Sequence, residues 1–164
     1  MKLTTYDGKE CEVNCIGCDV YDGRIPMEHS ILYEDNYWRI MQDTENPIIG
    51  FFVIGSKRHF RTLNEMNEEE SRRLFPLILE TRRVMVEVLG IKKTTLIQED
   101  GPVTMHFHPW LFPWYPWMDE IEGLGTEKIR AIMKISRDTM RTEQNIQNIN
   151  EALEKAKAAF QVSF

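Results

Sequence analysis

The residues best suited to chemistry are two histidines, His106 and His108, which flank Phe107. We expect them in a strand over residues 103–112. Side chains alternate along a strand, so both imidazoles would lie on one face, about 7 Å apart, with Phe107 on the other. Such a pair can share an anion or divide its work between a metal and a substrate. Two solvated histidines on an edge strand are the alternative.

Two cysteines form a second chemical feature. Cys15 and Cys18 have the C-x₂-C spacing with which two thiolates bind one zinc ion. A tetrahedral structural site needs two further ligands, and histidine is a usual supplement. Redox sites use the same spacing, normally at the start of a helix that follows a strand. Residues 22–26 (DGRIP) indicate a turn here. The spacing therefore favours a metal site, with redox chemistry as the alternative.

The composition limits the classes of partner. The chain has 164 residues, 42% of them hydrophobic, which suffices for one domain with a core. Its formal charge of −6, from 26 acidic and 20 basic residues, argues against non-specific nucleic-acid binding but allows a nucleotide. We see neither a membrane-spanning apolar run nor a secretory signal, so we expect no membrane contact and a cytoplasmic location. In a reducing compartment, clustered cysteines that include Cys11 suggest metal or redox chemistry rather than disulfides.

Apolar patterning predicts the strands that would position these residues. Residues 30–43 are rich in Ile, Tyr and Trp and predict two strands around a turn at Asp35-Asn36. The short apolar run at 50–55 is typical of a central strand that is covered on both faces. Two further strands are expected near 93–99 and 103–112.

The helices are indicated by capping residues and periodicity. Asn67 and Glu70 stand in capping-box register at the start of a helix that ends at Gly90, and Pro76 inside it should produce a kink. Residues 126–160 predict one long amphipathic helix, unbroken or broken, that must dock on its own domain or on a second subunit. We expect the proline-broken aromatic segment 109–118 to be irregular and to cover a core, with a binding surface as the alternative.

Five landmarks occur in an order that resembles the histidine-triad (HIT) superfamily over residues 15–113. They are the cysteine pair followed by Gly-x-Ile-Pro, the YED hairpin that ends in Asp43, the stretch from Pro47 and Gly50 to Lys57-Arg58-His59, the capped helix that closes with Leu89-Gly90, and the sequence HFHPWLFP in place of His-φ-His-φ-His-φ-φ-Pro. The resemblance implies an α+β fold in which an antiparallel sheet of about five strands carries a nucleotide. We divide the chain into a nucleotide-binding domain, residues 1–118, and a helical extension, residues 119–164.

The resemblance also implies roles for individual residues. In zinc-bearing members, and in the related galactose-1-phosphate uridylyltransferases, the metal is held by residues that match Cys15, Cys18, His59 and His106. His108 matches the central histidine of the triad, the nucleophile that forms a nucleotidyl-histidine. Cys11 has no matching position.

The same resemblance suggests a substrate site. Asp43 matches the acidic residue that accepts hydrogen bonds from the ribose hydroxyls; a turn aspartate at the hairpin end is the alternative. We expect Ile25 and Trp38, with Ile31 and Leu32, to line a base pocket. Thr104 is the polar candidate for the α-phosphate, although it lies one step farther along the strand. His29 is assigned to the surface.

The third triad position holds Trp110 instead of histidine. An indole donates one hydrogen bond but transfers no proton at neutral pH. The loss of a general acid typically costs about 10²–10⁴-fold in rate, least for good leaving groups such as phosphates. We therefore expect Trp110 to contact the substrate without acting as an acid.

Three functions follow as hypotheses. The first is a hydrolase or nucleotidyl transferase that acts at the α-phosphate of a dinucleoside polyphosphate or a nucleoside phosphoramidate. The second is a catalytically weakened, zinc-stabilised nucleotide-binding protein, and the third is a redox or metal-handling protein built on the cysteines. Because HIT proteins often pair, a homodimer is a further expectation.

Overall fold

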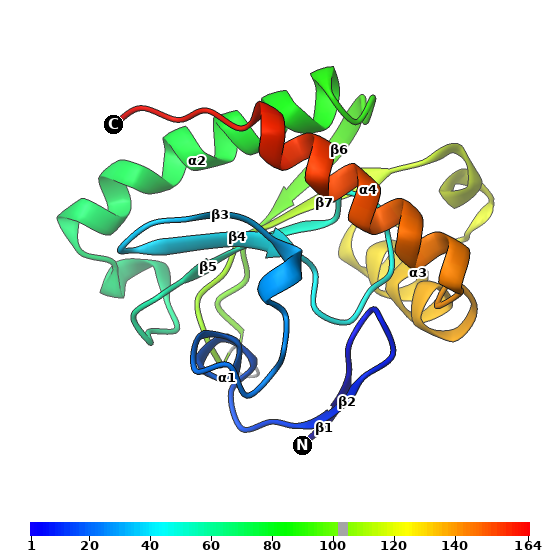
Figure 1. Ribbon diagram of the computed structural model, residues 1–164, viewed down its shortest axis with the longest axis horizontal. Coiled ribbons are helices and arrows are strands. Elements are labelled where there is room, and N and C mark those ends of the chain that lie inside the picture. Colours follow the sequence, from blue (N-terminus) through cyan, green and yellow to red (C-terminus); the bar gives the residue numbers. More distant parts are fainter. Residues whose placement is uncertain (102–104) are drawn as a thin grey trace.

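Strands rich in β-branched and aromatic residues build a central sheet. The structure is a computed structural model that describes residues 1–101 and 105–164 (Figure 1). The sheet is antiparallel with five strands in the order β3-β4-β5-β7-β6. Its strands are β3 (Ile31–Glu34), β4 (Trp38–Gln42), β5 (Phe52–Ser56), β6 (Lys93–Ile97) and β7 (Trp110–Trp114). The α+β class and the five-stranded antiparallel sheet predicted from the sequence are thus confirmed.

Alternation along β4 separates the two faces of the sheet. Trp38 and Ile40 are fully buried in the core that the sheet shares with helix α2 (Glu68–Glu87). Met41 packs in a second cluster on the opposite face, beside α1 (Ile16–Tyr21). That face also carries the hairpin of β1 (Lys2–Thr4) and β2 (Glu10–Glu12). Figure 1 shows α2 on one side of the sheet, with α1 and the hairpin on the other.

Helix α2 begins as its capping residues predict. The Asn67 side chain accepts a hydrogen bond from the Glu70 backbone N–H at 2.9 Å, and the Glu70 carboxylate accepts one from the Asn67 N–H at 2.8 Å. Arg58 adds two bonds to the same carboxylate at 2.8 and 2.9 Å. This arrangement ties the start of α2 to the segment that follows β5.

Two predictions near β7 need correction. The strand starts at Trp110, so His106 and His108 precede it and do not lie within a strand. The aromatic segment, in contrast, is regular. The Pro109 carbonyl accepts from the Ile54 N–H, so the backbone N and C=O groups of odd-numbered residues in this segment point toward β5. Pairing with β5 ends at Leu111, so the backbone nitrogen of Pro113 faces no partner strand. Pro113 therefore removes no bond from the ladder.

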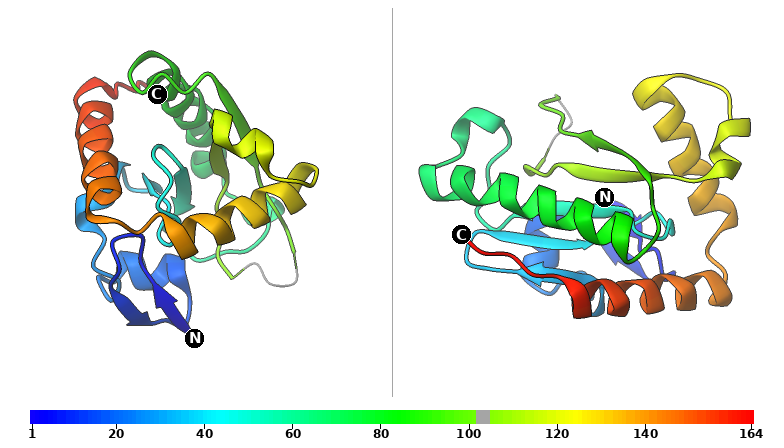
Figure 2. Two further views of the ribbon diagram at one scale, coloured as in Figure 1. Left: turned by 90° about the vertical axis from the view of Figure 1, so that its right-hand side faces the viewer. Right: turned by 90° about the horizontal axis from the view of Figure 1, so that it is seen from above.

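The C-terminal part consists of two helices rather than one. They are α3 (Gly125–Thr139) and α4 (Glu143–Ala159), and the break falls at Thr142, whose side chain caps α4 by accepting from the Asn145 N–H at 3.2 Å. Buried residues of α3 share a cluster with Phe112 of β7, and buried residues of α4 share the main core with the sheet. In the right-hand view of Figure 2, α4 runs alongside the sheet and α3 lies across one end of it. Among the described residues, no helix is long and apolar enough to cross a membrane.

Candidate active site and metal centre

Four potential metal ligands converge from three separate segments. The ligand atoms of Cys15, Cys18, His59 and His106 all lie within 4.8 Å of one another. The distances from each Sγ to each Nδ1 run from 3.2 to 3.8 Å. A tetrahedral zinc ion with bonds of about 2.3 Å to sulfur and about 2.05 Å to nitrogen would separate such atoms by about 3.6 Å. The residues present therefore fit a Cys₂His₂ zinc ion.

A short helix brings the two thiols together. Cys15 is the N-cap of α1 and Cys18 lies one turn later, so both side chains face the same side. The turn expected at residues 22–26 is present, but it follows a helix that the sequence analysis did not predict. The buried Asp19 carboxylate accepts from the backbone N–H groups of Asn14 and Cys15, at 2.7 and 3.2 Å, and so holds the start of the helix.

The imidazole of His106 is oriented as a metal ligand. Its Nε2 lies 2.6 Å from the carbonyl oxygen of Ser56, so Nε2–H donates and the Nδ1 lone pair faces the thiols. Burial lowers the pKa of His106, which favours the neutral ring that binds metals. A Cβ at Gly17 would stand 2.4 Å from Cγ of this ring, so only glycine fits there.

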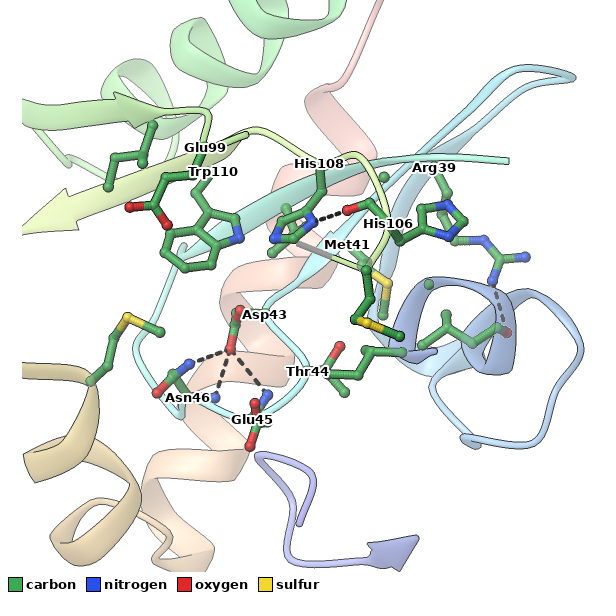
Figure 3. Close-up of a pocket in the computed structure, with 18 of the residues that line it drawn as sticks. Arg39, Met41, Asp43, Thr44, Glu45, Asn46, Glu99, His106, His108 and Trp110 are labelled. Atoms are coloured by element: carbon green, nitrogen blue, oxygen red, sulfur yellow. Dashed lines mark hydrogen bonds between the residues drawn. The ribbon is translucent and has the colours of Figure 1, made fainter. Parts of the chain in front are cut away.

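His108 faces a cavity on the same side as His106, although the segment is no strand. Phe107 between them is fully buried in the main core, and its N–H donates to the Phe60 carbonyl at 2.7 Å. The His108 Nδ1 lies 2.7 Å from the carbonyl oxygen of His106. Nδ1–H is therefore the donor, and in the neutral ring the lone pair is on Nε2. Figure 3 shows Nε2 on the Trp110 side, inside the cavity.

The cavity has a volume of about 340 Å³ and lies on the sheet face opposite α2. Its floor includes Arg39 and Met41 of β4, Asp43 and Trp110. Helix α1 supplies one wall and α3 the other; their lining residues are Ile16, Val20, Tyr21, Arg130 and Met133. One side of the cavity is thus apolar, while histidine, carboxylate and guanidinium groups are available elsewhere.

Asp43 is a turn aspartate that also lines the cavity. Its Oδ1 accepts from the backbone N–H groups of Glu45 and Asn46 and from the Asn46 side chain, at 3.0, 2.8 and 2.7 Å, which is the behaviour of a turn aspartate. The residue also lines the cavity. In Figure 3 the second oxygen lies on the side of His108. Burial raises the pKa of Asp43, and the bonds from Asn46 and Glu45 oppose that rise.

Comparison with known proteins identifies the fold. No family model matches the chain. An uncharacterised HIT-like protein of Methanocaldococcus jannaschii is 25% identical over 120 residues, 70% of this chain and 89% of that protein. A zinc-bound histidine-triad protein of Mycobacterium smegmatis has a TM-score of 0.60 at 19% identity and covers 89% of this chain and 97% of its own. A HIT family protein of Bacillus subtilis has a TM-score of 0.59 at 19% identity, with 87% and 96% covered. This chain has the histidine-triad fold.

Trp110, which the sequence resemblance matches to the third triad position, lines the cavity. Its ring centroid lies 5.5 Å from that of His108, and the rings are tilted by 38°. Figure 3 shows the indole nitrogen turned toward His108. The structure thus offers one hydrogen-bond donor beside Nε2 in place of an imidazole.

None of the four predicted base-pocket residues lines this cavity; Ile31, in β3, is one of them. Trp38 is fully buried on the other face of β4, where its Nε1–H donates to the Glu70 carbonyl at 3.1 Å. Ile25 is buried in the cluster beside the β1–β2 hairpin. Leu32 belongs to the core under α2, so it is no lining residue either. Trp38 and Leu32 are core residues because their side chains point to the α2 face of the sheet, away from the cavity.

Three further residues singled out in the sequence are His29, Cys11 and Thr104. His29 lies on the surface as expected, with 40% of its side chain exposed. Cys11 packs at the margin of a core cluster, away from the four ligands. Thr104 lies outside the described residues.

The sequence reading missed several cavity residues. Arg39 and Met41 could have been found, because alternation from Asp43 back along β4 places them on the same face. Arg130 and Met133 could not, since no local signal tells where α3 docks. The apolar wall is formed instead by Ile16 and Val20, with Met41 on the floor.

Proposed function

We propose that this protein is a nucleotide hydrolase or nucleotidyl transferase that acts at the α-phosphate of a nucleotide conjugate, with His108 as the nucleophile. The observation that carries the proposal is the His108 ring, whose Nδ1–H is bonded to the His106 carbonyl at 2.7 Å. This bond leaves the Nε2 lone pair in a cavity that also holds the Asp43 carboxylate. A fixed, neutral imidazole in such a position is what nucleophilic catalysis at phosphorus requires.

The reaction takes place in two displacements. In the first, the Nε2 lone pair forms a bond to the α-phosphorus while the bond from phosphorus to the leaving group breaks, and the leaving group departs with that electron pair. In the second, water attacks the phosphorus, the N–P bond breaks, and the electron pair returns to Nε2 as water loses its proton to solvent. An alcohol in place of water gives transfer instead of hydrolysis.

The rest of the nucleotide is accommodated by the walls of the cavity. Sugar hydroxyls would donate to the outer oxygen of Asp43, and the base would pack on Ile16, Val20 and Met41. Arg130, on the opposite wall, is paired with Glu99 at 2.9 and 3.1 Å and would exchange that carboxylate for negative charge on the leaving group.

A zinc ion held by Cys15, Cys18, His59 and His106 would serve as a structural ion that cross-links the site. By fixing His106, the four ligands also fix the carbonyl that receives the His108 Nδ1–H. The cytoplasmic location expected from the sequence would keep the thiols reduced and able to bind metal.

Trapping the covalent intermediate tests the proposal. Wild-type protein mixed with diadenosine polyphosphate or adenosine phosphoramidate, and with the guanosine equivalents, is quenched in base and its intact mass measured. We expect a mass increase of one nucleotidyl group or turnover of substrate, and neither in His108→Ala. His29→Ala, a surface histidine, is the matched control and should behave as wild type. Turnover that survives in His108→Ala would contradict the mechanism.

The presence of Trp110 supports a second candidate, a nucleotide-binding protein with little or no turnover, because the third position has no general acid. In that case His108→Ala would still bind nucleotide, and wild type would form no adduct. The third hypothesis, redox chemistry, has less support, because each thiol lies within 3.8 Å of two imidazole nitrogens in a metal-like cluster. The homodimer remains a prediction, which measurement of the protein's mass in solution would test.

A further inference from the structure

Helix α3 contacts the cavity through one face. Arg130, Met133 and Arg137 are spaced by three and four residues, so they lie on the same side of the helix. The first two line the cavity directly. Arg137 lies farther along and reaches the site through another residue, because its Nη1–H donates to the Asn46 side-chain oxygen at 2.8 Å.

The bond from Arg137 determines which way the Asn46 amide points. Asn46 is buried, with 1% of its surface exposed. Its oxygen accepts from the guanidinium, and its Nδ2–H donates to Oδ1 of Asp43 at 2.7 Å. A reversed amide would set its NH₂ group against the guanidinium and its oxygen against the carboxylate, which loses both bonds. Each bond involves one charged partner, and such bonds are stronger than neutral ones.

The amide in turn fixes the Asp43 carboxylate. Three donors converge on Oδ1, two from the backbone and one from the Asn46 side chain. Figure 3 shows these bonds on one oxygen and the other oxygen on the His108 side. Without the Nδ2–H donor, rotation of the carboxylate would be opposed only by the backbone bonds. The oxygen that faces the cavity would then lose its fixed direction.

We propose that Arg137 is a positioning residue that acts through Asn46 to aim the outer oxygen of Asp43 at the sugar hydroxyls of a bound nucleotide. This inference rests on the proposed function and deepens it, because it names the group on the ligand that the relay recognises. It also gives α3 a part in ligand selection. The relay favours nucleotides with intact ribose hydroxyls over those that lack them.

Calorimetric titration with AMP, GMP and their 2′,3′-dideoxy counterparts tests the relay. A hydrogen bond to a charged acceptor supports a preference of about tenfold or more for the ribose form in wild type. Arg137→Met should reduce that ratio to within about threefold by weakening AMP or GMP binding, while dideoxynucleotide binding stays near the wild-type value. Arg137→Lys, which keeps a cationic donor, should restore part of the preference. Lys134→Met, which removes an exposed cation from the same helix, should leave the ratio unchanged.

A merely structural role for Arg137 predicts a different pattern. If the residue only stabilised α3, both sugar forms would weaken together and the ratio would not move, which would overturn the relay. Asn46→Ala breaks the relay at its other partner and should show the same loss of preference; it replaces Arg137→Met if that variant does not fold. Failure of wild type to bind any of the four nucleotides would instead overturn the proposed function, and the sugar preference with it.

Discussion

At the scale of single residues, the site depends on how each ring nitrogen is used. His106 donates from Nε2 to the Ser56 carbonyl and presents Nδ1 to the thiols, while His108 donates from Nδ1 and presents Nε2 to the cavity. Two histidines one residue apart thus have opposite orientations and separate tasks. The backbone carbonyls decide this division, since each fixes one tautomer. The sequence predicted the pair and its shared face, but no residue pattern reveals which nitrogen a carbonyl will engage.

Trp110 provides a prediction at this scale. Trp110→His would place an imidazole beside Nε2 of His108, where the indole now lies at a centroid distance of 5.5 Å. We expect turnover of a nucleoside phosphoramidate to rise by about 10²-fold, because an amine leaving group needs a proton, and that of a dinucleoside polyphosphate to rise less. Steady-state kinetics with both substrates measures the difference. Trp110→Phe, which removes the N–H donor, should not raise either rate; equal gains in both substrates would contradict the acid role.

Gly17 provides a second prediction at the residue scale, concerning the metal site. Its missing side chain allows α1 to approach the His106 ring, and a Cβ there would stand 2.4 Å from Cγ. Gly17→Ala should therefore displace the imidazole from the thiols and lower the zinc content of the purified protein. Elemental analysis against protein concentration checks this. Full metal content in the alanine variant would contradict the predicted displacement of His106.

At the scale of elements, local signals succeeded where one residue acts on its neighbours. The capping box at Asn67 and Glu70 was predictable, because both partners lie in one turn. The strand at β7 was not, because the effect of Pro113 depends on where pairing with β5 ends. The Arg137 relay was equally hidden, since it joins α3 to the hairpin end, 91 positions apart in sequence. Interactions of that range are decided by packing, which no short pattern encodes.

The start of α2 yields a pH-dependent prediction. Burial raises the pKa of Glu70, but the hydrogen bonds from Arg58 and from the Asn67 N–H outweigh it, so the pKa lies below its ordinary value. A lowered folded-state pKa contributes stability above the unfolded pKa, about 4.3, and that contribution is lost as the pH falls through the folded value. Glu70→Gln should thus cost about 1–2 kcal/mol at pH 7, and the difference from wild type should shrink below about pH 4. Urea unfolding across this range measures it. The Glu69 side chain is 43% exposed, so Glu69→Gln should change the free energy of unfolding little at any pH.

At the scale of the whole molecule, a metal ion would join three segments that are far apart in the sequence. Cys15 and Cys18 belong to α1, His59 follows β5, and His106 precedes β7. Among the described residues, backbone bonds from Phe107 to Phe60 and from Ser56 and Ile54 to Phe107 and Pro109 join the histidine segment to its neighbours. Coordination at four points would therefore restrain α1 and the His108 segment together, and metal binding would appear as folding stability.

Removing the metal tests this coupling without any assay of activity. Protein purified without chelator should carry about one zinc per chain, and treatment with chelator should lower its Tm, because the binding free energy of a structural ion contributes to folding. Cys15→Ser should lose zinc and stability together. Cys11→Ser is the matched control, since that thiol lies in β2 away from the four ligands, and it should keep its zinc. If chelation emptied the site and left the Tm unchanged, the ion would have no structural role, and the position of His108 would depend on the protein bonds alone.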